Sequence, residues 1–150
     1  LGREGKKHQH IFFGYGSVDP IASFAWSLQG FKWGWQVWSS LRVPVYANRY
    51  GYKGALQSSS GLGLIYQYRQ MWRFVIEPQW FYEGVASWSG VQARNSGRTD
   101  FIPGFSIIYL LSTDDTFSVG AKFPQTLDMK GGQMSIPFIV SVGWNHLFAN

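Results

Sequence analysis

Apolar and polar residues alternate with a period of two along almost the whole chain. In residues 71–82, Trp72 and Ile76 fall on one face. Arg73 and Glu77 fall on the other. Such alternation is typical of β-strands that have one apolar and one polar face. The pattern predicts eight strands, at residues 9–16, 22–29, 33–46, 61–69, 71–82, 101–111, 116–123 and 136–148.

The connections between these segments alternate in length. After a short first connection, long stretches at residues 47–60, 83–100 and 124–134 alternate with tight turns. Short turns at one rim and long loops at the other are typical of outer-membrane barrels, which have an even number of strands. We therefore expect residues 1–150 to form one domain, an all-β, eight-stranded, antiparallel transmembrane β-barrel with up-and-down (meander) strand order.

The two faces of the predicted strands differ in bulk. The apolar faces carry many Trp, Phe and Tyr side chains, whereas the opposite faces are rich in Gly and Ser. An eight-stranded barrel has an interior just wide enough for its own side chains or one small ligand. We therefore expect the bulky face to look outward, toward lipid. A soluble β-barrel ligand carrier or sandwich, with the apolar face inward, is the alternative.

Composition narrows the classes further. Aromatic residues make up 19% of the chain and charged residues 14%, which excludes a disordered segment. The absence of cysteine excludes a disulfide framework, Cys-ligated metals and thiol nucleophiles. The net charge of +5 comes from scattered Lys and Arg, so we expect no nucleic-acid partner. A membrane-spanning helix needs about 20 consecutive apolar residues, and the sequence contains no such run, so no spanning helix is expected. The chain starts at Leu1, as a mature or trimmed product would.

Aromatic residues also gather near predicted strand ends at the short-turn rim. Amphipathic rings favour the level of the lipid headgroups, where they form girdles. The predicted interface anchors are Trp33, Trp35, Trp72, Trp144 and Phe148.

Four prolines fit the strands less well, since a proline removes a hydrogen bond from a sheet. Bulges, kinks or strand ends beyond the bilayer are expected at these sites, which are Pro44, Pro78, Pro103 and Pro137.

The last strand ends in SVGWNHLF, residues 141–148. With the strand count and the loop asymmetry, this end resembles the small eight-stranded outer-membrane barrels of Gram-negative bacteria, of the OmpA, OmpX and PagP type. The resemblance implies a place in the bacterial outer membrane, contact with membrane lipids and insertion by the barrel-insertion machinery through the C-terminal strand. His146 stands where a hydrophobic residue is usual, and Ala149 and Asn150 follow Phe148. There are two alternatives. The chain could be a mitochondrial outer-membrane barrel, or it could be a piece of a larger barrel.

The polar faces predict a charged lumen. Its expected residues are Arg42, Arg69, Arg73, Glu77 and Lys122. Because segments 61–69 and 71–82 adjoin, we expect an ion-pair network of Arg69, Arg73 and Glu77, since buried charges need partners. Such a network would plug the lumen and prevent conduction, so we expect the protein to have a structural or loop-mediated interaction role. A small passive porin-like channel with anion preference is the alternative, because four cations face one carboxylate.

We expect neither an enzyme nor a metal or cofactor site. Lipid A deacylases of the PagL type carry a His-x-Ser pair and a Glu, and palmitoyl transferases of the PagP type use His, Asp and Ser; neither pattern is present. His8 and His10 share a face but have no third ligand nearby. Residues 84–100 carry Trp88, Arg94 and Arg98. They are either a solvated loop or a contact for lipopolysaccharide phosphates, which Arg suits by its geometry.

Overall fold

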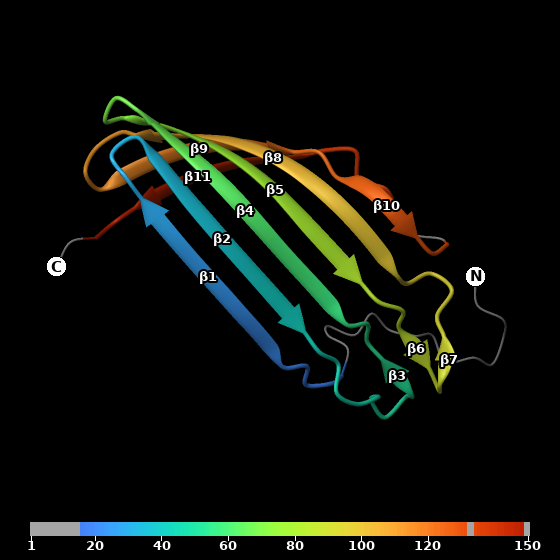
Figure 1. Cartoon of the computed structure of the whole chain (residues 1–150). Helices are drawn as coiled ribbons and strands as arrows, with labels where there is room; N and C mark the ends of the chain where they lie inside the picture. The colour runs from blue at the N-terminus through green and yellow to red at the C-terminus, as the bar shows by residue number, and fades with distance from the viewer. Residues whose placement is uncertain (1–15, 132–133, 149–150) are drawn as a thin grey trace, which may run out of the picture.

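Most of the described part of the chain forms one large curved sheet, and the described residues contain no helix. A computed structural model describes residues 16–131 and 134–148. Within these ranges no helix is long and apolar enough to cross a membrane. The long strands are β1 (Ile21–Gln29), β2 (Trp33–Arg42), β4 (Gln57–Tyr68), β5 (Trp72–Glu83), β8 (Arg98–Leu110), β9 (Asp115–Lys122) and β11 (Ile139–His146). They pair antiparallel in that order, so the sheet is an up-and-down meander (Figure 1).

The all-β, antiparallel, up-and-down part of the prediction is confirmed, and seven of the predicted strands are present with shifted ends. β2 stops at Arg42 because Pro44 follows it. β4 starts earlier than predicted, at Gln57, because its Ser-rich beginning pairs with β2 on one side and β5 on the other. Of the predicted strand at residues 9–16, residues 9–15 lie outside the described residues, and Gly16 lies in a bend with φ 67°.

Closure into a barrel is not present among the described residues. β1 and β11 pair with one neighbour each, and no pairing joins them to one another. Every residue of β1 is exposed, on both of its faces. The described sheet is therefore an open arc with two free edges (Figure 1).

The long connections contain strands that the sequence pattern did not predict. β3 (Tyr52–Lys53), β6 (Ser87–Trp88) and β7 (Val91–Gln92) form a small second sheet, and β10 (Gln125–Met129) pairs with the beginning of β8. They lie at what we call the loop end of the large sheet (Figure 1). The opposite end, with tight turns at residues 30–32, 69–71 and 111–114, is the turn end.

The register assigns each strand residue to one of two faces. Opposed residues of antiparallel strands point to the same side, so Leu64, Ile76 and Phe105 share the apolar face. Large side chains on this face are exposed; Ile76, for example, keeps 58% of its surface accessible. The polar face lies on the inside of the curve, where Gly61 and Gln79 are buried.

The prolines are accommodated in two ways. Pro44 and Pro137 lie outside the strands, after β2 and before β11. Pro78 and Pro103 oppose each other directly in β5 and β8. Because neither has an N–H, this pair cannot be one that exchanges hydrogen bonds, and each missing N–H would point away from the partner strand. On the β4 side of Pro78 the ladder is correspondingly interrupted, between the pairs of Gly61 and Leu64.

Candidate functional site

The polar face holds a tryptophan that bridges two non-adjacent strands. Trp38 of β2 donates from its indole Nε1 to Oε1 of Glu77 in β5, at 2.7 Å. The indole passes over Gly61 of the intervening β4, where a Cβ would lie 2.5 Å from Nε1. Trp38 is a large aromatic residue on the polar face, where it is in phase with Gln36 and Ser40. The even-numbered positions of β2 could therefore have shown from the sequence that Trp38 lies on the polar face.

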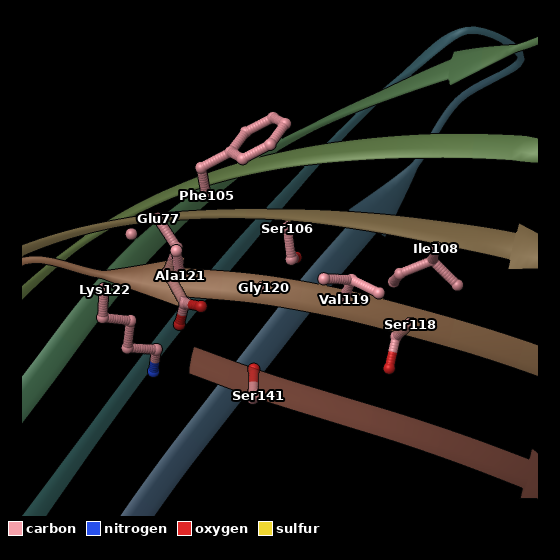
Figure 2. A pocket seen from close by; sticks show the side chains of 11 residues that line it. Glu77, Phe105, Ser106, Ile108, Ser118, Val119, Gly120, Ala121, Lys122 and Ser141 are labelled. Carbon is pink, nitrogen blue, oxygen red and sulfur yellow. The ribbon is translucent and has the colours of Figure 1, made fainter. Parts of the chain in front are cut away.

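A hollow of about 240 Å³ adjoins Glu77 on the same face. Lys122 and Glu77 are both in register with Gly104, from opposite sides, and the glycine leaves room between them. Three hydroxyl groups, those of Ser106, Ser118 and Ser141, also line it (Figure 2). Lys122 forms no ion pair with any residue that the structure describes. The hollow therefore offers one cation, one carboxylate and hydroxyl groups to water or a small polar solute.

The structure does not bring Arg69, Arg73 and Glu77 together in the predicted network. Arg69 lies in the tight turn after β4, with φ 51°, and its guanidinium stacks 5.4 Å from the ring centre of Tyr68. Arg73 donates from Nε to Oε1 of Gln67 at 2.7 Å. Glu77 is four residues further along β5, about 13 Å away at strand spacing. These three side chains therefore do not form the predicted ion-pair network on the polar face.

Arg42 has a carboxylate partner that the sequence analysis missed. Its Nε and Nη2 donate to Oδ2 of Asp19, at 3.0 and 2.6 Å, and the Asp19 side chain is 4% exposed. This ion pair holds the chain before β1 against the loop end of β2, together with a bond from the Val18 N–H to the Tyr46 hydroxyl at 2.9 Å. The signal was weak, since Asp19 and Arg42 are far apart in sequence.

Arg98 is engaged in a second unforeseen ion pair, with the buried Asp100. The Nη1 atom of Arg98 also donates to the Met134 carbonyl at 3.0 Å. The Oδ1 atom of Asp100 accepts no hydrogen bond from a described residue. The Arg98 guanidinium thus binds partners within the protein, which argues against the phosphate-contact alternative at this residue. Trp88 and Arg94 are exposed.

The predicted anchors lie together at the turn end. Trp33 and Trp72 begin β2 and β5 on the apolar face and stack on Tyr66 and Tyr109, with ring centres 4.7 and 4.5 Å apart. Trp35 follows on the same face.

The C-terminal anchors lie at the same end. Nε1 of Trp144 donates to Asp115 Oδ1 at 3.0 Å, and Nδ1 of His146 lies 2.9 Å from the same oxygen. Phe148 packs edge-on against His146, with ring centres 4.6 Å apart. At the opposite end Trp80 and Phe101 make a comparable aromatic pair, at 4.9 Å.

No group of three or more His, Asp or Glu residues that could hold a metal occurs within residues 16–131 and 134–148. His8 and His10 lie outside these ranges. Comparisons of the chain with protein-family models, with curated proteins and with solved structures found no match. The chemistry of the two faces is therefore what indicates a function.

Proposed function

We propose that the chain is an integral β-barrel of a bacterial outer membrane, with a structural or loop-mediated interaction role. The distribution of charge between the faces carries this proposal. On the apolar face of the seven long strands there is no Lys, Arg or Glu, and the carboxylate of Asp115 lies at the turn end. The opposite face holds Arg42, Arg73, Glu77 and Lys122. A cation on a lipid-facing midplane position costs about 2–4 kcal/mol, so lipid contact favours this split.

Strand length and aromatic spacing support the same proposal. β4, β5 and β8 contain 12, 12 and 13 residues, and a tilted strand needs about 9–11 residues to cross a bilayer. Trp72 and Trp80 are eight positions apart on the apolar face of β5, which corresponds to about 26 Å along the strand. At the strand tilt of about 35–45° that is typical of outer-membrane barrels, this spacing projects to about 20 Å across the membrane, which fits within an apolar band about 25 Å tall.

A membrane position requires the gap between β1 and β11 to close, because each unpaired backbone group in lipid costs several kcal/mol. We propose residues 9–16 as the eighth strand, since their apolar residues alternate in the required way. Further strands of a larger barrel are the alternative. Because the chain has no cysteine, disulfides can test the closure. Cysteines at Ile11, Phe13 or Tyr15 should cross-link to Phe24→Cys on β1 and to Val142→Cys on β11.

The lipid contact itself is tested by spin labels on single cysteines. Phe24→Cys and Val119→Cys place a label on the apolar face, and their matched partners Ser27→Cys and Ser118→Cys place it on the polar face. In reconstituted bilayers, dissolved oxygen should relax the first two labels strongly. A water-soluble nickel complex should not reach them. Equal access of the nickel complex to all four labels would overturn the membrane proposal.

A small passive pore with anion preference is the second candidate function, and the hollow beside Lys122 is the observation that favours it. We favour the interaction role because Trp38, Gln36 and Gln79 occupy the polar face of the central strands. The long loops add folded structure of their own, which suits binding of a partner. Ion conductance distinguishes the two functions.

A further inference from the structure

The small sheet at the loop end joins two loops that are distant in sequence. β3 comes from the connection between β2 and β4, and β6 and β7 come from the connection between β5 and β8. The register places Tyr52, Trp88 and Val91 opposite one another, on one face. The rings of Tyr52 and Trp88 pack with centres 4.8 Å apart. We call β3, β6 and β7, with Arg49, Tyr50 and Arg94, the loop platform.

Several hydrogen bonds hold the loop platform in shape. The side-chain oxygen of Asn48 accepts from the N–H groups of Tyr50 and Tyr52, at 2.9 and 3.0 Å. The N–H of Ser89 donates to the Gly51 carbonyl at 2.7 Å. Gly51, with φ 78°, packs so closely on Ser89 that a Cβ would lie 2.5 Å from its hydroxyl. The platform is therefore a folded surface that presents its side chains in fixed positions.

Large aromatic and apolar side chains of the platform are open to solvent. Tyr50 is 54% exposed, Trp88 45% and Val91 71%. The guanidinium of Arg49 lies 4.7 Å from the centre of the Tyr50 ring and donates to the Tyr50 hydroxyl at 2.6 Å. An exposed aromatic ring offers an apolar face to the C–H groups of a sugar ring, and a cation beside it can hold an acidic group of the same ligand.

The charge of the platform is of one sign. Residues 43–56 and 84–97 contain three cations and no Asp or Glu, and the cations are Arg49, Lys53 and Arg94. None of the three forms an ion pair with a described residue. The turn end is balanced by comparison, since Lys32 and Arg69 share it with Asp114 and Asp115. An anionic partner therefore prefers the loop platform.

We infer that the loop platform binds the phosphorylated saccharide headgroup of a glycolipid in the surrounding membrane leaflet, an inference that rests on the proposed membrane function. The aromatic face supplies the surface for the sugar, and the cations, which have no carboxylate partner among the described residues, supply the phosphate contacts. Arg94 and Arg49 come from the two different loops, so one headgroup would bind both loops at once.

The test measures binding of detergent-purified, full-length protein to mixed micelles that contain phosphorylated lipid A. Matched micelles contain dephosphorylated lipid A or phosphatidylglycerol, which has a phosphate but no saccharide. We expect the phosphorylated glycolipid to bind at least about tenfold more tightly than either, because two charge-assisted contacts are involved. Equal binding of phosphatidylglycerol would overturn the inference.

Two variants locate the site. Arg49→Gln with Arg94→Gln removes two platform cations, and Lys32→Gln with Arg69→Gln removes two cations at the turn end as a matched control. We expect the platform variant to lose about tenfold in affinity and the control to keep the affinity of the wild type. Trp88→Ala should weaken binding of both lipid A forms. Equal losses in the platform variant and the control would refute a platform site. The spin-label pattern would then still report membrane insertion, so failure of this inference and failure of the membrane proposal are distinguishable.

Discussion

Trp38 reaches across an intervening strand to Glu77, and the glycine beneath it makes the contact possible. The 2.7 Å bond from the indole Nε1 joins β2 to β5, which do not pair with each other. Gly61 of β4 lies under the indole. The Glu77 carboxylate also lines the hollow next to it. The hydrogen bond between Trp38 and Glu77 thus packs the indole on the polar face and also holds the Glu77 carboxylate beside the hollow.

Gly61→Ala tests this packing. The added methyl group would lie 2.5 Å from Nε1 and 2.7 Å from the neighbouring ring carbon of Trp38, and a rigid indole cannot move aside cheaply. We expect a loss of about 1–3 kcal/mol in the free energy of unfolding, the usual cost of overpacking, measured by urea denaturation in detergent. Ser59→Ala on the same face of the same strand adds no volume and should change the free energy by much less.

The bond itself is tested by a double-mutant cycle of Trp38→Phe and Glu77→Gln. Trp38→Phe leaves the carboxylate without its donor and should lower the free energy of unfolding by about 1–3 kcal/mol. If the contact stabilises the sheet, the double variant should lose less than the sum of the single variants. Additive losses would show that the two side chains act independently. Trp26→Phe on the apolar face serves as the control for loss of an indole.

Neighbouring residues of β9 separate the two faces. Val119 lies on the apolar face and Ser118 on the polar face, beside the hollow. We expect Val119→Arg to prevent stable insertion into liposomes, because a cation at the lipid midplane costs about 2–4 kcal/mol. Ser118→Arg should insert. Vesicle flotation measures both, and insertion of Val119→Arg at the level of the wild type would contradict the assignment of the faces.

Planar-bilayer recordings of the wild type should show no steady ion current. The physical reason is the occupation of the polar face by Trp38, Gln36 and Gln79, which would fill the narrow interior of the proposed eight-stranded barrel. Arg73→Glu changes a charge on this face without touching the Trp38 contact. Steady currents that this variant abolishes, or whose ion preference it reverses, would establish the pore function instead.

Catalysis is the last function to test, and we expect none. Incubation of the reconstituted protein with lipid A and phospholipids should leave their masses unchanged in mass spectrometry, because the sequence shows no nucleophile paired with a base. Acyl release or transfer would contradict this prediction. His146→Ala would then be the first variant to examine, because His146 and Asp115 lie side by side at the turn end.

Strand positions followed from the sequence because period-two alternation is a local property that each strand carries by itself. The contacts on the polar face did not, since they depend on register. Trp38 meets Glu77 because β2, β4 and β5 align at Gly61, and no local pattern states that alignment. The network of Arg69, Arg73 and Glu77 was expected from adjacency alone. It failed because the left-handed turn at Arg69 directs that residue away.

The loop platform was missed for a related reason. β3, β6 and β7 have two residues each, too few for alternation to be recognised. The pairing of β3 with β6 joins segments about 35 residues apart. Glycine and aromatic residues are also common in loops that form no sheet, so their presence did not predict this pairing. The ion pair of Asp19 with Arg42 was missed in the same way, because tertiary structure decides which charged residues meet.

The facing prolines of β5 and β8 have a consequence for how the chain folds. Pro78 and Pro103 can oppose each other only at a position where the two strands exchange no hydrogen bonds. Sliding one strand by a single residue would put one of the two prolines at a position that requires an N–H, and it would also turn the aromatic side chains of one strand inward. The two prolines therefore penalise that misaligned hairpin before the remaining strands have assembled. They act against one-residue slips between the two longest neighbours at the centre of the sheet.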